Sequence, residues 1–425
     1  MKLYIQNSAQ SSESGQSIMF IVRLSVYHQR FYRVKTQVLG CASIARNTTI
    51  EQNNETNSNQ QPHRTIKDKA NTMTAAGTMR AWRTHEYGNP TEVLKLDIVD
   101  IPEPNDGELR VKVLAIPFNL NDLERVMGGN MMVKPELPYS PGMEVMGIVD
   151  ACGAGAEAWL GKRVVAMPAG AHGGFAEYAI CPTVSAFSMP ESIPLPGAAA
   201  LYFPFHLAWL GLHDRAKVKA GDTVLIHAAA GGVGSAAIQL AVNAGASVIA
   251  TAGSDEKLAL CRELGASVTI NYNTEDFVAI VKENTGGKGV DIVFDNVGEA
   301  VMEQSFASIA YDGRYIMMGF ASGKAVADEK FLVPRRISLS NISLCAVMLA
   351  YADPATSAFL KDGMGWNFVP EALGQEINDN IIDLVVDKKI APVVGQLVEF
   401  EDLPQALEDM ANRKTVGRTI VKLYE

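Results

Sequence analysis

His227-Ala-Ala-Ala-Gly-Gly-Val-Gly234 follows directly on the apolar run Thr223–Ile226 and leads into a helix-compatible segment, SAAIQLAVNA, at 235–244. The pattern predicts a strand, a glycine-rich turn and a helix that begins at the turn. The first backbone N–H groups of a helix have no partners within it and carry partial positive charge, so they bind anions such as a pyrophosphate. The glycines lack a Cβ, which allows a sharp turn and a close approach of phosphate. The spacing AxxGxxG is a variant of the dinucleotide-binding fingerprint, with alanine in place of the first glycine.

The chain is long, and most of it is acidic. Its 425 residues are enough for about two or three domains, and 48% of them are hydrophobic. Residues 1–78 hold nine Lys/Arg against four Asp/Glu, which is a net charge of +5. The remaining residues therefore carry a net charge of −15, and the total is −10. An acidic body argues against nucleic acid as a partner. We also expect no membrane partner, because Arg23 interrupts the best apolar run, Ile18–Val26, well short of the roughly 20 residues a membrane helix needs.

The five cysteines lie far apart in the sequence, with no Cys-x-x-Cys pair. This usage is typical of reduced thiols and excludes a sequence-local cysteine zinc knuckle. We therefore expect a cytoplasmic protein.

Residues 1–78 differ from the rest of the chain. Asn47–Gln61 (NTTIEQNNETNSNQQ) is polar and has little that could form a core, which is typical of disorder. Ser17–Arg46 is basic, contains aromatic residues and has no acidic residue, which leaves a transit-type targeting sequence open. We favour an upstream translation outside the natural protein, since Met73 and Met79 would both be clean starts. We interpret the segment as a disordered extension or an artefactual start and assign it no function.

From Met79 onward the pattern predicts two kinds of structure. Residues 79–150 alternate apolar and polar in short runs, such as Leu109–Ile116, which is typical of a β-rich domain. From about Gly197, strands alternate with helices, which indicates a parallel sheet wound on both faces. The expected strands are Thr223–His227, Ser247–Thr251, Ser267–Ile270, Val290–Phe294 and Tyr315–Gly319, and the expected helices are Ser235–Asn243, Asp255–Leu264 and Glu275–Thr285. We expect a last strand, Thr419–Leu423, to return to the β-rich domain.

Several motifs in order along residues 79–425 resemble those of the medium-chain dehydrogenase/reductase superfamily, in its zinc-free NADPH:quinone oxidoreductase branch. The matching stretches are Asn119-Leu-Asn-Asp122, Pro141-Gly-Met-Glu144, Gly173-Gly-Phe-Ala-Glu-Tyr178, Gly221-Asp222, His227–Gly234, Asn271-Tyr272 and Asp295-Asn-Val-Gly298. The resemblance implies an α/β protein, in which a GroES-like β-rich catalytic domain carries an inserted Rossmann domain with a doubly wound parallel sheet. We expect the first part of the catalytic domain at 79–203, the Rossmann NADPH-binding domain at 204–345 and the return to the catalytic domain at 346–425.

The end of the second Rossmann strand favours NADPH. NAD-binding sites usually place an acidic residue about 20 positions after the glycine turn, where it bonds the ribose 2′-OH. Here Ala252 occupies that position, and the hydroxyl of Ser254 and the cation of Lys257 suit a 2′-phosphate. Asp255-Glu256 compete with this interpretation, but the helix dipole explains them as first-turn residues. The resemblance implies that the 2′-phosphate is held by Gly253, Lys257, Tyr272 and Arg413.

The resemblance implies further cofactor contacts from the turn and from the strand ends. Open α/β sheets bind their ligands at the carboxyl ends of the strands, where these residues lie. They are Ala229, Gly231, Gly232, Val233, Gly234, Asn296, Val297, Gly319, Phe320 and Ala321.

The positions of the catalytic zinc ligands are altered. Zinc-dependent relatives have a cysteine, a His-Glu pair and a further cysteine or histidine around the metal. Asn119 occupies the position of the first cysteine and Met143 that of the histidine, and an amide and a thioether are poor zinc ligands. We therefore expect no metal. His172 and His206 could reach the site, but we expect both to be hydrogen-bonded structural residues.

Reduction of an isolated carbonyl is hard without a Lewis acid, whereas a quinone or conjugated enone needs less assistance. Hydride adds to its C=C bond, and one hydrogen bond can stabilise the charge that develops on oxygen. We therefore expect an NADPH-dependent enzyme whose small-molecule partner is a quinone or an enone. The resemblance implies that Asn119 and Asp122 line the catalytic site, although the same residues could simply cap a helix.

Two departures from the family pattern bear on the substrate. Leu207-Ala208-Trp209 replaces a Thr-Ala-Tyr run, and Gly128–Met132 lacks the tyrosine found there in many relatives, so a phenolic proton donor would have to come from Tyr139 or Tyr202. Reduction of a 2-enoyl thioester becomes a less favoured alternative. A structural or regulatory NADPH-binding protein with little turnover is another, because a fold and a cofactor site do not guarantee catalysis.

Ser340–Val347 resembles the edge strand through which this family pairs two Rossmann sheets. An exposed apolar edge is a liability unless it is covered or paired. We therefore expect a homodimer with a contact between two copies of this strand.

Overall fold

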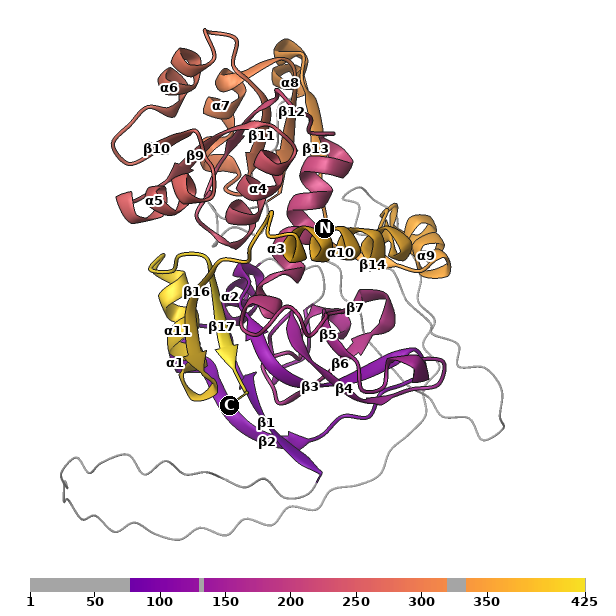
Figure 1. Ribbon diagram of the computed structural model, residues 1–425. Coiled ribbons are helices and arrows are strands. Elements are labelled where there is room, and N and C mark those ends of the chain that lie inside the picture. The colour runs from indigo at the N-terminus through magenta and orange to yellow at the C-terminus, as the bar shows by residue number, and fades with distance from the viewer. Residues whose placement is uncertain (1–76, 130–133, 319–333, 425) are drawn as a thin grey trace, which may run out of the picture. The chain divides into compact units, whose positions relative to one another are not determined.

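Residues 223–346 contain the strands of a six-stranded parallel sheet (Figure 1). In the computed structural model, which describes residues 77–129, 134–318 and 334–424, its strands lie in the order β10-β9-β8-β11-β12-β13. The order along the chain reverses between β8 and β11, which is the arrangement of a doubly wound dinucleotide-binding sheet. The strands are β8 (Thr223–Ile226), β9 (Ser247–Ala252), β10 (Val268–Asn271), β11 (Val290–Asp295), β12 (Ile309–Met317) and β13 (Ser343–Ala346).

Helices cover both faces of this sheet. Successive side chains of a strand point to opposite faces. In β8, Val224 and Ile226 pack in one core cluster with α3, α4 and α5, whereas Leu225 packs in another with α6 and α7. The doubly wound architecture is therefore confirmed. The helices are α3 (Tyr202–Trp209, continued by a π-helix, Leu210–Arg215), α4 (Gly232–Asn243), α5 (Asp255–Glu263), α6 (Phe277–Asn284), α7 (Glu299–Ser308) and α8 (Pro334–Ser340).

A second sheet contains the β-rich part of the chain. Its strands follow the path β16-β17-β3-β4-β5-β7, with β6 pairing against β3 beside that path. β17, near the C-terminus, pairs antiparallel with β3, so the end of the chain returns to the sheet that its first part builds. The strands are β3 (Glu108–Pro117), β4 (Val145–Cys152), β5 (Arg163–Ala166), β6 (Tyr178–Pro182), β7 (Ala186–Ser188), β16 (Val394–Glu399) and β17 (Arg418–Lys422).

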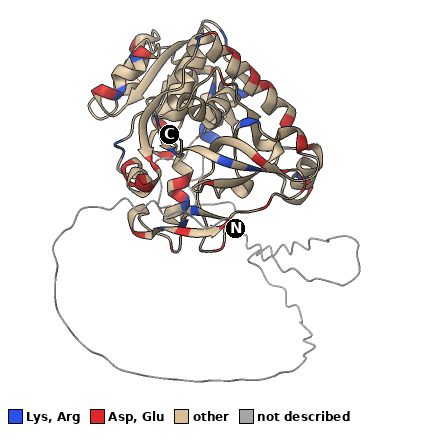
Figure 2. Ribbon diagram, turned by 60° about the horizontal axis from the view of Figure 1, so that its bottom comes forward, with Lys and Arg blue, Asp and Glu red and all other residues tan. Residues whose placement is uncertain are grey.

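Smaller elements surround the two sheets. They are β1 (Thr78–Thr84), α1 (Pro90–Val93), β2 (Leu94–Asp100), α2 (Leu120–Met127), β14 (Tyr351–Ala352), α9 (Pro354–Met364), β15 (Val369–Pro370), α10 (Glu371–Val386) and α11 (Leu403–Ala411). No helix in the described ranges is long and apolar enough to cross a membrane. Acidic and basic positions are interspersed along the described chain (Figure 2).

The expected Rossmann strands and helices are present, with shifted ends. The helix after the glycine turn begins at Gly232, three residues earlier than expected, because the turn itself supplies its first residues. α6 begins at Phe277 because the Asp276 side chain accepts the N–H of Val278 and caps it there. Most of the expected extension 1–78, and Gly319–Ala321, lie outside the described residues. The domain boundaries stay a prediction.

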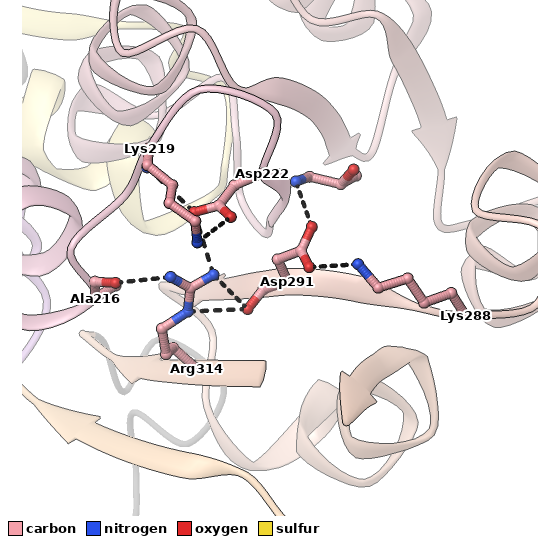
Figure 3. Close-up of polar contacts among 7 residues, drawn as sticks. Ala216, Lys219, Asp222, Lys288, Asp291 and Arg314 are labelled. Atoms are coloured by element: carbon pink, nitrogen blue, oxygen red, sulfur yellow. Dashed lines mark hydrogen bonds and ion pairs between the residues drawn. The ribbon is translucent and has the colours of Figure 1, made fainter. Parts of the chain in front are cut away.

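An ion-pair network ties together the amino ends of β8 and β11 and the neighbouring part of β12 (Figure 3). Arg314 in β12 lies 3.2 Å from Asp222 and donates to the carbonyl of Ala216 at 3.1 Å. Asp222 is 4% exposed and also accepts from Lys219 Nζ at 3.0 Å. Asp291 in β11 accepts the N–H at the start of β8 at 2.9 Å. The network therefore fixes β8, β11 and β12 at the end of the sheet opposite to the glycine turn.

Candidate functional site

The glycine turn joins the carboxyl end of β8 to the start of α4. Ala228, at the position of the first fingerprint glycine, has φ of 50°, a conformation that glycine adopts more readily. Gly231 is the N-cap residue of α4 and provides no side-chain cap. A Cβ at Gly234 would lie 2.4 Å from the carbonyl oxygen of Ala228, so the helix start packs directly on the turn. The first N–H groups of α4 therefore point outward with no capping side chain, which suits an anion.

A second cluster lies at the carboxyl end of β9. Ser254 caps α5 by accepting the N–H of Lys257 at 3.4 Å. Lys257 Nζ donates to the carbonyl of Arg413 at 3.1 Å, which brings in the loop before β17. A Cβ at Gly253 would lie 2.5 Å from the hydroxyl of Tyr272. The structure thus brings together all five residues expected around a 2′-phosphate, from three separate parts of the chain.

The loop after β11 lies against the base of the glycine turn. Asn296 Nδ2 donates to the carbonyl of His227 at 3.0 Å. Asp295 accepts the N–H groups of Val297 at 2.8 Å and Gly298 at 3.0 Å, and it also accepts the hydroxyl of Tyr315. Asn296 is therefore held beside the turn and Val297 follows it, and their role as cofactor contacts stays a prediction. Gly319, Phe320 and Ala321 lie outside the described residues, and their expected role stays a prediction.

His227 links the strand ends beneath the turn. Its Nδ1 lies 3.0 Å from Thr251 Oγ1 of β9, and its Nε2 lies 2.9 Å from Ser305 Oγ of α7. Burial lowers the pKa of His227 to about 3. The neutral imidazole is thus part of the frame that holds the turn.

We expect the stability of the protein to fall in acid, in part through His227. In the unfolded chain histidine has a pKa near 6.5, so the stability contributed by a neutral buried His227 is present above that pH and is lost as the pH falls toward 3. For one such group the loss between pH 7 and 5 is about 2 kcal/mol. Urea unfolding at pH 7 and pH 5 measures the free energy of unfolding. Between these pH values it should fall by about 2 kcal/mol less in His227→Gln than in the wild type. An unchanged pH dependence would contradict the assignment.

Asn119 and Asp122 begin α2 on the β-rich side. Asp122 Oδ2 accepts the N–H of Asn119, and its Oδ1 accepts the N–H of Met143, both at 2.9 Å. Asp122 is 0% exposed, and burial raises its pKa to about 6. The carboxylate of Asp122 has no exposed surface, and both of its oxygens accept backbone N–H groups, so the expected contact with substrate is not supported. Asp122 instead positions Asn119 and Met143 relative to one another. This agrees with the alternative that these residues cap a helix.

Glu144 is the centre of a buried polar cluster beside Asn119. Its Oε2 accepts from Arg418 Nη2 at 2.7 Å and from Asn119 Nδ2 at 3.0 Å, and its Oε1 accepts the N–H of Phe203 at 3.1 Å. Arg418 Nη2 also lies 3.3 Å from Asn119 Oδ1. The side chains of Arg418 and Glu144 are 4% and 0% exposed. Both ends of the Asn119 amide therefore have a charged partner.

Arg418 also contacts the glycine turn. A Cβ at Gly232 would lie 3.0 Å from Arg418 Cδ, and the N–H of Gly417 donates to the carbonyl of Ala230 at 3.0 Å. Sequence reasoning did not single out Arg418. The available signal was a charged residue directly after a glycine, at the start of a strand whose first four residues are buried, Arg418-Thr-Ile-Val421.

The remaining histidine and tyrosine candidates are buried, except for His172, which is partly exposed. His206 Nδ1 lies 2.8 Å from the hydroxyl of Tyr351, and burial lowers the pKa of His206 to about 3. His172 packs edge-on against Tyr139, whose hydroxyl donates to the carbonyl of Arg125 at 3.0 Å. Tyr202 is 1% exposed. These positions fit structural roles better than proton donation to a substrate.

The donor set around Asn119 does not fit a catalytic zinc ion. The amide of Asn119 and the thioether of Met143 are poor ligands, and the carboxylate of Glu144 is already bonded to Arg418. In the part of the chain that the structure describes, no group of three or more His, Cys, Asp or Glu side chains could hold a metal ion.

Comparison with known proteins gives two matching family models. The model described as "Zinc-binding dehydrogenase" matches residues 232–360, and the "Alcohol dehydrogenase GroES-like domain" matches residues 105–191. A quinone oxidoreductase of Sus scrofa is 31% identical over 350 residues, covering 81% of this chain and 98% of the relative.

Two solved structures have a similar fold over most of the chain. A mycobacterial protein complexed with NADPH has a TM-score of 0.69 and 31% identity, covering 81% of this chain and 99% of that one. The JamJ enoyl reductase in its apo form has a TM-score of 0.67 and 27% identity, covering 81% of this chain and 99% of that one.

Proposed function

The chain belongs to the quinone oxidoreductase branch of the medium-chain dehydrogenase/reductase superfamily and is therefore an oxidoreductase; from this premise we propose that it uses NADPH, without a catalytic metal, to reduce a quinone or a conjugated enone. One combined observation carries the proposal. The glycine turn leaves the start of α4 without a capping side chain, and the side chains around Asn119 do not form a zinc site.

The residues around the glycine turn fit NADPH. The uncapped start of α4 would hold the pyrophosphate, through N–H groups of Gly232, Val233 and Gly234. Lys257 and Arg413 would place positive charge at the 2′-phosphate, beside the hydroxyls of Ser254 and Tyr272. No acidic residue occupies the strand end, where Ala252 is buried. A 2′-phosphate therefore fits this cluster better than a free ribose diol.

Asn119 is the residue proposed to meet the acceptor. When bound, NADPH would supply a hydride to the acceptor. An amide NH₂ has two N–H groups, and one of those of Asn119 bonds Glu144 at 3.0 Å. The second can donate to the acceptor oxygen, where negative charge develops as the C=C electrons move toward it. With the candidate tyrosines buried, the proton that completes the reduction of an enone would come from solvent.

A panel of acceptors tests this proposal and separates it from its alternatives. The full chain is assayed for NADPH oxidation with quinones, conjugated enones and a 2-enoyl thioester, before and after treatment with a metal chelator. We expect turnover with a quinone or an enone, unchanged by the chelator. Turnover confined to the thioester would favour the enoyl reductase alternative, which the likeness to an enoyl reductase structure keeps open. Tight NADPH binding without turnover would favour a structural or regulatory protein.

Lys257→Ala tests the choice between NADPH and NADH. Loss of one charge-assisted hydrogen bond to the 2′-phosphate should raise the Kd of NADPH about 10-fold and leave that of NADH unchanged. Isothermal titration of both nucleotides measures this. Lys282→Ala, which removes an exposed lysine from the last turn of α6, is the matched control and should change neither Kd. Equal losses for both nucleotides in Lys257→Ala would remove Lys257 from the 2′-phosphate site.

We also propose a homodimer and a cytoplasmic location. β13 is the end strand of its sheet, and its residues are partly or fully exposed. Pairing with β13 of a second copy would cover this edge. The four cysteines in the described ranges are free, which suits a reducing compartment. Light scattering on the full chain well above micromolar concentration should give the mass of a dimer, and a monomer would overturn the first proposal.

A further inference from the structure

We propose that Arg418 and Glu144 form a positioning pair that couples the glycine turn to Asn119, so that nucleotide binding and the orientation of the Asn119 amide depend on one another. The inference rests on the proposed function in taking NADPH as the ligand of the turn and Asn119 as the contact of the acceptor.

On one side, the pair selects a single orientation of the Asn119 amide. Its Nδ2 donates to Glu144 at 3.0 Å, and its Oδ1 faces Arg418 Nη2 at 3.3 Å. Turning the amide over would set its NH₂ group against the guanidinium and its oxygen against the carboxylate. The two charges therefore exclude that orientation and leave one N–H of Nδ2 in a fixed direction.

On the other side, Arg418 is packed against the start of α4. Its Cδ lies 3.0 Å from the position of a Cβ on Gly232, and the preceding residue forms a parallel bridge with Gly231. Arg418 Nε is buried and has no hydrogen-bond partner among the described residues. A buried N–H without a partner is costly. This Nε lies 3.8 Å from the position of a Cβ on Gly232, at the start of α4.

Stability alone does not account for this pair. Buried ion pairs are often no more stabilising than apolar residues of similar volume, because desolvation offsets their attraction. Among the residues that the structure describes, Glu144 bonds Arg418, Asn119 and Phe203, and of these three Arg418 is the one that packs on Gly232 at the start of α4. Coupling between two sites is reciprocal in binding free energy. A change at Glu144 should therefore alter nucleotide affinity, although Glu144 does not touch the turn.

Charge-conserving variants test the coupling without any acceptor. Glu144→Asp shortens the side chain by one methylene, so its carboxylate moves away from Arg418. Arg418→Lys removes the planar guanidinium group. Neither variant changes the net charge beside the turn. The Kd of NADPH is measured by isothermal titration on the full chain for the wild type, each variant and the double variant. We expect Glu144→Asp to raise the Kd about 10-fold in the wild type and less than about 2-fold in the Arg418→Lys background. An unchanged Kd in Glu144→Asp, or effects that multiply in the double variant, would overturn the proposal.

Asp222→Asn is the matched control. Asp222 is a carboxylate of similar burial that also pairs with an arginine, Arg314, but at the opposite ends of the strands (Figure 3). It should lower thermal stability and leave the Kd of NADPH within about 2-fold of the wild type. An equal loss of affinity in Asp222→Asn would show that destabilisation alone moves the Kd, and the proposal would fall.

A second experiment measures how a change in the glycine turn affects the reaction with the acceptor. It does not require that Glu144→Asp folds. Gly232→Ala presses on Arg418, whereas a Cβ at Gly363, an exposed glycine of α9 far from the glycine turn in the sequence, would have no neighbour within 4 Å. At saturating NADPH, Gly232→Ala should lower kcat/KM for the acceptor about 10-fold and Gly363→Ala should leave it near the wild-type value. Equal effects of the two variants would contradict the coupling. If the wild type turns over no acceptor at all, the proposed function fails, while the Kd measurements above still decide the coupling.

Discussion

Replacing Gly234 by alanine is expected to abolish most of the nucleotide affinity of this protein. The added Cβ would lie 2.4 Å from the carbonyl oxygen of Ala228 and 2.6 Å from Ala229 Cα, and both are backbone atoms that cannot rotate away. The start of α4 would have to move off the turn and displace the N–H groups proposed to hold the pyrophosphate. Each charge-assisted hydrogen bond lost costs about 1.5–3 kcal/mol, so the Kd of NADPH should rise about 10- to 150-fold.

Gly231→Ala is the control for the steric effect of Gly234→Ala. It adds the same methyl group to the same turn, but at a residue with φ of −78° and no neighbour closer than 3.4 Å. Its thermal stability should match the wild type, whereas Gly234→Ala should lose about 1–3 kcal/mol by overpacking. Titration calorimetry and thermal unfolding measure the two quantities separately. Wild-type affinity in Gly234→Ala would show that the turn does not hold the nucleotide as described.

Much of the nucleotide-binding half could be predicted from the sequence because its signals are local. A strand, a glycine-rich turn and a helix follow one another within residues 223–244, and the alternation continues through β12. The cluster proposed to hold a 2′-phosphate could be predicted in part because Gly253, Ser254 and Lys257 lie together at one strand end. Tyr272 and Arg413 are distant in sequence and were found only through the family resemblance.

The polar cluster around Asn119 could not be predicted in the same way. Asn119, Glu144 and Arg418 come from three separate parts of the chain, and they meet only because β17 returns to pair with β3. Burial was also invisible in the sequence. Asp122 was expected to face a substrate, but its carboxylate is used by two backbone N–H groups. No local pattern distinguishes these roles.

Removing Arg418 is expected to be the most destabilising single change in the site. Arg418→Met would leave Glu144, which is 0% exposed, without its cationic partner at 2.7 Å. Breaking a buried pair in this way costs about 3–5 kcal/mol in the free energy of unfolding. Chemical denaturation of the full chain at neutral pH measures the loss.

Two further variants separate lost pairing from lost packing. Arg418→Met combined with Glu144→Gln removes the stranded charge and should recover part of the stability. Arg314→Met removes an arginine from Asp222, but Lys219 remains at 3.0 Å, so its cost should be smaller than that of Arg418→Met. Equal losses in Arg314→Met and Arg418→Met, or no recovery in the double variant, would contradict the role given to the Arg418–Glu144 pair.

Isotopic transfer tests the central claim most directly. The full chain is mixed with a conjugated enone and NADPH that carries deuterium at both C4 positions of the nicotinamide, and the product is analysed by mass spectrometry and NMR. We predict one deuterium on the β-carbon of the reduced enone, with NADPH consumed in equal amount. A product without deuterium, or no consumption of NADPH with any quinone or enone of the panel, would contradict the assignment of this chain as an NADPH-dependent reductase of conjugated acceptors.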